Sequence, residues 1–596
     1  MRISRLQIDN FRNFHYCEIH LDTHAVIVGE NKVGKSNLLY ALRLVLDPRL
    51  PDTERQLRLE DFWDGLPRPL SKDDVINISV DLTDFENNES LLAVLTDHLV
   101  APEPMVARLT YLYRPFPELD RPPQKESDYE FVTYGGGKPE NRFGFDLRLS
   151  LPMTLLPALR NAEEDLFNWR RSPLAPLLEA VASETDPAQL AAAAANVSTA
   201  TDEIAGIPGI RQLGSQIKQR LEHMVGPTHA VDTSLGFSPT DAQRLIRALR
   251  LFIDNGMRGI ADASLGCANL IYLTLLSLDL ERQVRQGSRH HTFLAIEEPE
   301  AHLHPHLQRL AFRDFLATRT APEGAENESQ SRTVLLTTHS PHVVSVAPLK
   351  SLVILKRALR EESTIGVSTA KLTFDAATID DLERYIDVDR GECVFAKGIL
   401  LVEGPAEEYL VPALGKFLGA DFDKFGISVC SVSGVNFEPY IRLFGPQGLD
   451  IPFAVITDKD PQDRNGISRG ERRVCNLVQA LMPNPPEPQS PEQLLGQAPT
   501  LGIFLNEHTL EVDLFRSGHH KVMCDTLSEL TTNGAAKTRC EQWSQDPGTL
   551  DPLQFIKDIT EVGKGRFAQR LASHLTEALC PEYIAAAIRH VRTKLS

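Results

Sequence analysis

The sequence lacks closely spaced cysteines: eight are scattered over 596 residues, and no CxxC motif occurs. This spacing excludes a disulfide framework and a cysteine-based zinc site, and it favours a reducing compartment. Long apolar runs are also missing, because ANLIYLTLLSL (268–278) is far shorter than the roughly 20 residues that cross a bilayer. The N-terminal MRISRLQIDN alternates like a strand and has no apolar signal core. We expect a soluble cytoplasmic protein without a membrane partner.

Excess positive charge is absent as well. The chain carries 62 Lys and Arg against 81 Asp and Glu, a formal net charge of −19. A chain coated with basic residues for nucleic acid is therefore excluded, and any contact with DNA must come from local basic patches or from bound metal ions. The sequence also has no internal repeat and no long heptad pattern, which excludes a repeat protein and a long coiled coil.

Four stretches of different character follow one another along the chain. Strand-like alternation and one helical segment fill 1–155, whereas helical spacing of apolar residues dominates 156–255. Strand-like runs return over 256–390, and a new α/β pattern with closing helices occupies 391–596. We predict an α/β fold in which a helical insertion divides the first domain and a second domain follows. The apolar faces of the inserted helices could form a dimerisation surface or pack as a plain bundle on the domain.

GENKVGKS (29–36) matches the phosphate-binding pattern GxxxxGK[ST], and it lies between an apolar strand and a helix, as that pattern requires. The glycines let backbone N–H groups close around phosphates, and the helix N-terminus adds a favourable dipole. We expect Lys35 to neutralise β- and γ-phosphate oxygens and Ser36 to hold Mg²⁺. The predicted nucleotide-binding residues of this segment are Gly29, Asn31, Gly34, Lys35, Ser36 and Asn37.

FLAIEEPE (293–300) supplies the acids that nucleotide hydrolysis needs, because an apolar strand ends there in two carboxylates. Glu297 is expected to face Mg²⁺ and Glu298 the attacking water. Read alone, the segment could equally be a strand end whose acids cap the next helix. The histidines of EAHLHPH (300–306) could suggest a metal cluster, but we favour the start of a helix beside the site.

Two further segments carry a family resemblance. ASLGCANL (263–270) resembles the signature motif of ABC-type ATPases, with Ser264 and Gly266 opening a helix, and TTHSP (337–341) puts His339 where those ATPases hold a histidine near the γ-phosphate. The order of these motifs resembles the ATPase heads of the SMC and RecF group. Such heads hydrolyse ATP between two protomers, which implies a homodimer or higher oligomer. FRNF (11–14) matches their N-terminal strand, which implies that Arg12 and Asn13 lie near the nucleotide.

A second group of acids follows apolar runs in the last part of the chain, within the segments 399–410, 454–460 and 508–514. Acids at positions i and i+2 of a strand end point the same way, and parallel strands present their C-terminal tips to one crevice. Unpaired carboxylates gathered there would repel each other, whereas oxygen-only ligands suit Mg²⁺ or Mn²⁺. Two such ions about 4 Å apart would clamp the reacting oxygens of a phosphodiester. The candidate ligands are Glu403, Glu407, Asp458, Asp460, Glu511 and Asp513.

A Glu at one strand tip followed by DxD at a later one resembles the Toprim domain. With an ABC-type ATPase in front, the chain resembles the overcoming lysogenization defect (OLD) family of nucleases. The resemblance implies a catalytic role for Lys564 in GKGRFAQRLA (563–572) and a helicase-like protein as a possible partner. Nearby Arg566 and Arg570 are either phosphate contacts or ordinary surface charges. SRGERR (468–473) is a local basic patch suited to DNA phosphates.

These patterns predict an ABC-type ATPase head with a helical insertion, followed by a Toprim domain with a parallel sheet. We expect an ATP-binding and ATP-hydrolysing, metal-dependent DNA endonuclease with two Mg²⁺ or Mn²⁺ ions, Glu403 among its catalytic residues, and a role in antiviral defence or DNA repair. One alternative is a non-cleaving, ATP-driven DNA clamp of the RecF type. Another is a topoisomerase-like enzyme, which would need a nucleophilic tyrosine such as Tyr409 or Tyr440.

Overall fold

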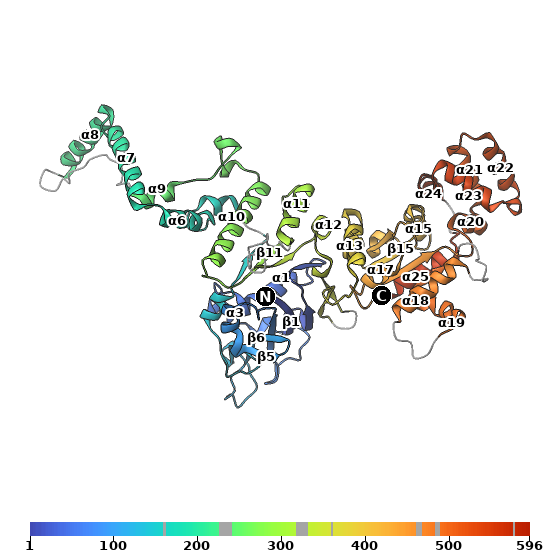
Figure 1. Ribbon diagram of the computed structural model, residues 1–596, viewed down its shortest axis with the longest axis horizontal. Coiled ribbons are helices and arrows are strands. Elements are labelled where there is room, and N and C mark those ends of the chain that lie inside the picture. The colour runs from blue at the N-terminus through green and yellow to red at the C-terminus, as the bar shows by residue number, and fades with distance from the viewer. Residues whose placement is uncertain are drawn as a thin grey trace.

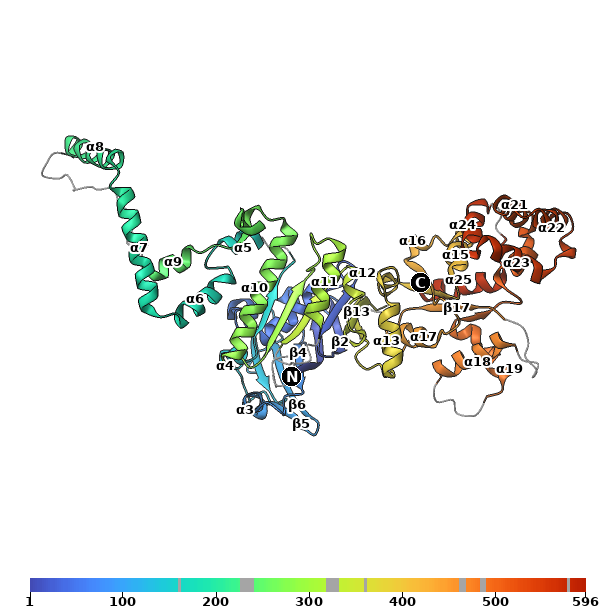
Figure 2. The same cartoon turned by 45° about the horizontal axis from the view of Figure 1, so that its top comes forward.

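The computed structural model describes residues 1–158, 162–225, 241–317, 332–358, 362–459, 468–482, 489–575 and 579–595. Figures 1 and 2 show three regions in a row: a helical arm, an ATPase body and a C-terminal body. Within the described residues, no helix combines the length and the apolar content needed to cross a membrane.

The first sheet of the ATPase body is antiparallel, with strand order β2-β1-β4-β6-β5 and β7 paired to β6. The buried residues of β1 are Ile3, Leu6, Ile8 and Phe11, so one face of the strand packs into the core, as expected from the N-terminal alternation. A register shift between Ile3 and Arg5 interrupts that alternation. Its strands are β1 (Arg2–Phe11), β2 (Phe14–His20), β4 (Ile76–Thr83), β5 (Leu99–Pro102), β6 (Met105–Pro115) and β7 (Tyr129–Gly135).

The second sheet has strand order β14-β13-β3-β12-β11-β8, and all of its pairings are parallel except β13 with β14. It is buried on both faces: Ala25 and Ile27 of β3 join the core shared with the first sheet, whereas Val26 and Val28 join a second core. Its strands are β3 (Ala25–Gly29), β8 (Met153–Leu156), β11 (Thr292–Glu297), β12 (Arg332–Thr337), β13 (Leu352–Arg357) and β14 (Thr364–Ser368).

Helix α1 (Lys35–Leu46) follows β3 and contacts both sheets, so the phosphate loop is held between them. Helices α10 (Leu265–Arg285), α11 (Pro305–Leu316) and α12 (Pro341–Val344) contribute Leu273, Phe312 and Val343 to the second core.

The described residues of the predicted insertion form mainly helices, separated by short turns, between 162 and 225 and again from 242 to 248, as their apolar spacing suggested. Helices α7 and α8 extend away from the body (Figures 1 and 2), and Ala194 is the buried residue of α7. The helices are α5 (Ala162–Phe167), α6 (Leu174–Glu184), α7 (Pro187–Ala205), α8 (Pro208–Val225) and α9 (Ala242–Ala248).

The C-terminal body contains the predicted parallel sheet, with strand order β16-β15-β17-β18. Its strands are β15 (Gly398–Val402), β16 (Ile427–Ser431), β17 (Phe453–Thr457) and β18 (Ile503–Leu505). Ile399 and Leu401 face the second core of the ATPase body, whereas Leu400 and Val402 face a third core formed with C-terminal helices. The parallel sheet is therefore buried on both sides.

Helices surround this sheet. The helix α15 (Pro405–Phe417) begins three residues after β15, and α18 (Arg469–Leu481) follows β17. The remaining helices of the body include α17 (Glu438–Phe444), α20 (Leu510–Leu514), α21 (His520–Leu530), α22 (Gly534–Gln545), α23 (Pro552–Val562), α24 (Lys564–His574) and α25 (Glu582–Leu595).

Candidate functional site

The phosphate loop joins β3 to α1, in the strand–loop–helix context expected from the sequence. The Lys35 ammonium group donates to the carbonyl oxygens of Gly29 at 2.8 Å and Glu30 at 3.0 Å. Gly34 has φ +101°, and a Cβ there would collide with the side chain of Asn13. Glycine is therefore required at this position, both for the backbone conformation and for the close approach. Asn31 and Ser36 are exposed.

The FRNF segment contacts the phosphate loop directly. Asn13 donates from Nδ2 to the Val33 carbonyl at 2.8 Å, and Asn37 donates to Asn13 Oδ1 at 2.6 Å. Arg12 donates to Asn37 Oδ1 at 2.9 Å, and its guanidinium lies 4.6 Å from the centre of the Tyr40 ring. The structure thus places Arg12, Asn13 and Asn37 in one hydrogen-bonded group at the start of α1.

The acids of FLAIEEPE lie near the phosphate loop. Glu297 ends β11, and the next residue, Glu298, turns the chain with φ +41°. Glu298 Oε1 lies 3.5 Å from His339 Nε2, so two residues that were each predicted to lie at the nucleotide site are neighbours. Burial lowers the pKa of Lys35, while the negative charges of Glu298 and Glu300 oppose that shift. Both carboxylates therefore act on the lysine of the phosphate loop.

Glu300 is a residue that sequence reasoning missed. Its Oε1 accepts hydrogen bonds from the Thr338 hydroxyl and from the His339 backbone N–H, both at 2.8 Å. It thus links the turn after β11 to the His339 segment after β12. Glu300 is visible in the sequence as the last acid of the EEPE run. Its partners, Thr338 and His339, follow only from the pairing of β11 with β12.

The signature segment opens α10 as predicted. Ser264 is the N-cap and accepts from the Cys267 N–H at 3.3 Å, and its side chain is exposed. A Cβ at Gly266 would collide with the His302 carbonyl oxygen, so this helix start packs tightly on the loop after β11.

In the EAHLHPH segment, Arg309 donates to His306 Nδ1 at 2.8 Å. Among the described residues no group of three or more His, Cys, Asp or Glu side chains is arranged to hold a metal ion.

Glu403 follows β15 directly, and one of its carboxylate oxygens is fully engaged. Oε1 accepts from the Thr457 hydroxyl at 2.6 Å, the Asp458 N–H at 2.9 Å and Arg473 Nη1 at 2.7 Å. Parallel pairing of β15 with β17 brings these groups to one sheet edge. The structure therefore joins the two acidic segments 399–410 and 454–460 at their strand tips, as the sequence predicted.

Glu407, Asp458 and Glu511 act on one another electrostatically. Burial, followed by the charges of Glu403, Glu407 and Glu511, raises the pKa of Asp458 to about 8. Burial, with added repulsion from Glu511 and Glu403, raises the pKa of Glu407 to about 7. Glu407 and Glu511 are buried, so their charges interact in a poorly solvated space.

Lys564 lies in the same group, because its Nζ is 3.0 Å from Glu511 Oε1. Burial is the largest single influence and would lower the pKa of this lysine, but the charge and hydrogen bond of Glu511, together with the charges of Asp458 and Glu407, raise it overall. Four acids from three distant segments and one lysine thus meet at the carboxyl edge of the parallel sheet: Glu403, Glu407, Asp458, Glu511 and Lys564.

The structure does not bring Asp513 into this group. Its Oδ2 accepts from the backbone N–H groups of Glu507 and His508, both at 3.1 Å, so it fixes the turn before its own helix. The segment 510–514 is helix α20, in which residues two apart point in different directions. The i and i+2 spacing therefore gave a wrong expectation for the direction of the Asp513 side chain. Asp460 lies outside the described residues.

Arg473 and Asn506 are further residues missed as partners of the acids. Arg473 is the last residue of the SRGERR patch, and its guanidinium contacts Glu403 and Thr457 rather than only solvent. Asn506 follows β18 and donates to Asp458 Oδ1. The sequence indicated a basic patch near Arg473 but carried no signal for Asn506.

Tyr440, a candidate nucleophile of the topoisomerase-like alternative, packs with its ring centre 4.2 Å from that of Tyr385. Burial raises the pKa of Tyr440 to about 12, which is unfavourable for a nucleophile.

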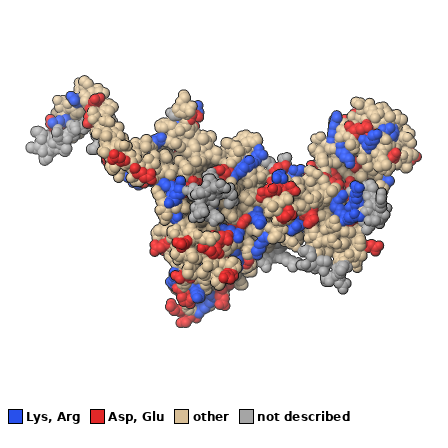
Figure 3. Space-filling model, in the orientation of Figure 1, with Lys and Arg blue, Asp and Glu red and all other residues tan. Residues whose placement is uncertain are grey.

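Basic and acidic side chains are interspersed over the visible face, with one group of basic side chains on the C-terminal body (Figure 3). Arg469 and Arg472 of the SRGERR patch are exposed.

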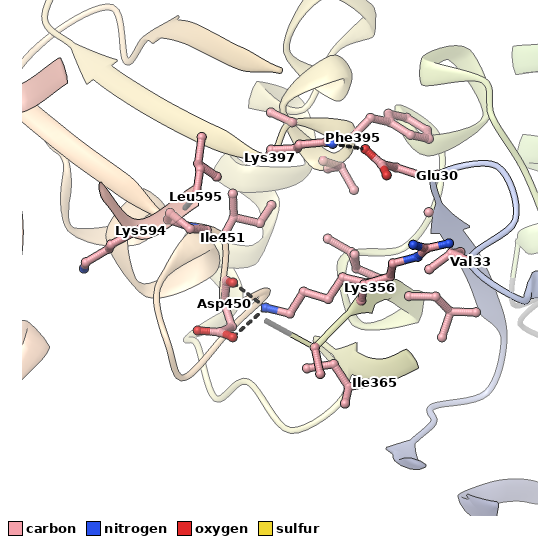
Figure 4. A pocket seen from close by; sticks show the side chains of 18 of the residues that line it. Glu30, Val33, Lys356, Ile365, Phe395, Lys397, Asp450, Ile451, Lys594 and Leu595 are labelled. Carbon is pink, nitrogen blue, oxygen red and sulfur yellow. Dashed lines mark hydrogen bonds and ion pairs between the residues drawn. The ribbon is translucent and has the colours of Figure 1, made fainter. Parts of the chain in front are cut away.

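A cleft of about 1090 Å³ separates the phosphate loop from the C-terminal sheet (Figure 4). Val33, Ile451 and Leu595 are among its apolar lining residues. Two ion pairs connect the bodies: Lys397 Nζ to Glu30 Oε1 at 2.8 Å, and Lys356 Nζ to Asp450 Oδ2 at 2.5 Å.

The fold and these two sites define an ABC-type ATPase joined to a Toprim domain. The family model for the overcoming lysogenization defect protein-like Toprim domain matches residues 394–460, and the model for the AAA ATPase domain matches 1–104 and 159–344. The chain is 24% identical to the OLD nuclease of Thermus scotoductus over 480 residues, which are 77% of this chain and 82% of that protein. It is 21% identical to the Old nuclease of Escherichia phage P2, over 73% of each chain.

The solved C-terminal region of the Burkholderia pseudomallei OLD protein is 39% identical to this chain. The match covers 34% of this chain and 100% of that region, with a TM-score of 0.32. This protein belongs to the OLD family.

Proposed function

We propose that this protein is a metal-dependent DNA endonuclease whose ATPase domain binds and hydrolyses ATP. The observation that carries the proposal is the meeting of four carboxylates and Lys564 at one edge of the Toprim sheet. The family relatives named as nucleases support the same reaction class.

The oxygen donors of this acidic group suit a pair of hard divalent ions, although no three of its described carboxylates are already arranged to hold one. Glu403, Glu407, Asp458 and Glu511 offer oxygen atoms alone, which is the donor set that Mg²⁺ and Mn²⁺ prefer. Burial, and after it the charges of the neighbouring acids, raise the pKa values of Glu407 and Asp458, and bound cations would offset that negative charge. When bound, such ions supply electrostatic stabilisation to the attacking and leaving oxygens of a phosphodiester. We assign no ligand role to Asp513, and the role of Asp460 stays a prediction.

In this proposal the chain's own residues position DNA and balance charge. The Lys564 ammonium, held beside Glu511, offsets negative charge that builds up on the phosphate during cleavage. Arg469 and Arg472 are exposed beside the strand tip of β17 and would contact backbone phosphates without reading bases.

In the ATPase domain, nucleotide binding would move Lys35 from the Gly29 and Glu30 carbonyls to the phosphates. Ser36 and Glu297 would hold Mg²⁺, and Glu298 with His339 would face the attacking water. The exposed Ser264 at the start of α10 is free to face a second protomer's phosphate loop, which supports a homodimer or larger assembly. A helicase-like partner and a role in defence or repair remain expectations from the family resemblance.

Supercoiled plasmid incubated with purified protein and Mn²⁺ tests the proposal. We expect nicked or linear products from the parent and from Lys35→Ala, which should lose ATP hydrolysis because the two sites are separate. Glu403→Ala should stop cleavage and keep ATP hydrolysis. A parent that hydrolyses ATP but leaves plasmid intact with Mg²⁺ and with Mn²⁺ would instead favour the DNA clamp. Equal cleavage by Glu403→Ala and the parent would disprove the assigned site.

A further inference from the structure

Asn506 lies at the carboxyl edge of the Toprim sheet, directly after β18, and its side chain is buried. It makes hydrogen bonds to three consecutive residues of the neighbouring strand tip. Its backbone N–H donates to the Thr457 carbonyl at 3.2 Å, its Nδ2 donates to Asp458 Oδ1, and its Oδ1 accepts from the Lys459 N–H at 2.7 Å. One side chain therefore fixes both the carboxylate and the turn of the DxD segment.

Both ends of the Asn506 amide are committed within the protein. Its oxygen already accepts a backbone N–H, and an amide nitrogen does not ligate hard cations. Asn506 is thus poorly suited to hold a ligand itself. Its donor nitrogen instead engages one oxygen of Asp458 and leaves the other oxygen, Oδ2, without a bond to Asn506.

Glu403, at the adjacent strand tip, is held in the same manner. Its Oε1 accepts three hydrogen bonds, from Thr457, from the Asp458 backbone and from Arg473, and none of these three donors reaches Oε2. Two acids on neighbouring parallel strands therefore each have one oxygen bound by the protein and one oxygen outside those bonds. A ligand held by both acids would meet one oxygen from each.

We infer that Asn506 is a positioning residue of the cation site: by holding Asp458 Oδ1, it presents Asp458 Oδ2 as a monodentate ligand for a divalent cation. The inference rests on the proposed function, because it concerns the same site. Groups that orient the ligands of a metal ion typically change metal affinity or activity by about 10- to 100-fold when they are removed. A purely structural asparagine would change stability and leave cation binding as it was.

The experiment measures Mn²⁺ binding to the full chain without ATP or DNA, by electron paramagnetic resonance of free Mn²⁺. Asn506→Leu keeps the branched shape of the side chain, with a somewhat larger volume, and removes both polar groups, and Asn506→Ser provides a smaller, polar second variant. We expect either variant to weaken Mn²⁺ binding at least about 10-fold. In plasmid cleavage, each should need more Mn²⁺ for half-maximal rate and approach the parental rate at saturation.

Arg539→Met is the matched control for damage to the fold. Arg539 forms a two-point ion pair with the buried Asp558, at 2.9 and 2.7 Å, on helices α22 and α23 of the same body. This variant should lose stability and bind Mn²⁺ like the parent.

Parental Mn²⁺ binding by a folded Asn506→Leu or Asn506→Ser protein overturns the inference. Glu403→Ala distinguishes this from failure of the proposed function. If Glu403→Ala also binds Mn²⁺ like the parent, the acidic group does not hold the cation and the proposed function fails with it. If Glu403→Ala loses binding and the Asn506 variants do not, only the inference on Asn506 is wrong. If Arg539→Met weakened Mn²⁺ binding as much as the Asn506 variants do, the inference on Asn506 would also be wrong, because the loss would then reflect general damage to the fold.

Discussion

Arg473 and Glu403 form a largely buried ion pair, with side chains 12% and 19% exposed and a distance of 2.7 Å. Removing one member of such a pair leaves the other charge without compensation in a poorly solvated place. We predict that Arg473→Met lowers the free energy of unfolding by about 3 kcal/mol, measured by urea denaturation. Millimolar Mn²⁺ should restore part of that loss, because a bound cation supplies positive charge beside Glu403. An unchanged urea midpoint would contradict this account of the pair.

His24, just before β3, gives a pH-dependent prediction. Its Nδ1 accepts from the Val334 N–H at 3.1 Å, and burial, with the charge of Arg332, lowers its pKa from 6.5 to about 4. Below pH 6.5 the unfolded chain takes up a proton that the folded chain refuses until about pH 4, so stability falls as pH falls across this window. Between pH 6.5 and 5 the loss is about 2 kcal/mol.

His24→Asn keeps an acceptor near Val334 and removes the titrating ring. Urea unfolding at pH 7 and pH 5 should therefore show a smaller loss of stability for His24→Asn than for the parent, by about 2 kcal/mol. An equal loss in both proteins would show that His24 does not titrate as argued.

At the level of elements, the sequence predicted where the strands of the Toprim sheet end, but not which side chains from other elements contact the acids at those ends. The apolar runs before Glu403 and Asp458 identified two parallel strands, and geometry then forced their tips to one edge. For the 510–514 segment, the expectation that Glu511 and Asp513 point the same way was wrong. Residues i and i+2 share a direction in a strand, but this segment is helical, and the spacing alone does not tell the two apart. Helix α20 turns Glu511 toward Lys564 and Asp513 toward the Glu507 and His508 backbone. Asn506 and Arg473 could not be assigned either, since their partners depend on how strands and helices assemble.

Helix α24 places a cation where helices disfavour one. Lys564 is its first residue, and the N-terminal end of a helix carries partial positive charge. The nearby Glu511 offsets that cost, so the arrangement is better explained by the site than by helix stability. We predict that Lys564→Met lowers the plasmid cleavage rate about 100-fold or more at saturating Mn²⁺. Mn²⁺ binding without DNA should persist; parental cleavage would exclude a role for this lysine in the reaction.

For the whole molecule, the ATPase and Toprim sheets share one hydrophobic core. Val26 and Val28 of β3 belong to the same buried cluster as Ile399 and Leu401 of β15. Trp543 belongs to the core on the opposite face of the Toprim sheet. The sequence suggested separate domains, and it could not show this continuity because composition does not reveal which apolar faces meet.

A shared core predicts that nucleotide binding in the ATPase domain stabilises the Toprim domain as well. With ADP at about 100 times its dissociation constant, the stabilisation should approach 3 kcal/mol. Fluorescence of Trp543, in a variant with Trp63→Phe and Trp169→Phe, should report an unfolding midpoint that rises with ADP. The Lys35→Ala version of the same variant should not respond. A Trp543 midpoint that ignores ADP in the parent background would mean that the domains unfold independently.

Crystals soaked in Mn²⁺ and measured at the manganese absorption edge test the central claim most directly. We predict anomalous density for two ions at the carboxyl edge of the Toprim sheet, among Glu403, Glu407, Asp458 and Glu511, which is lost in crystals of Glu403→Ala. Manganese bound elsewhere, with no density among these four acids, would contradict the claim that they form the cation site of a nuclease.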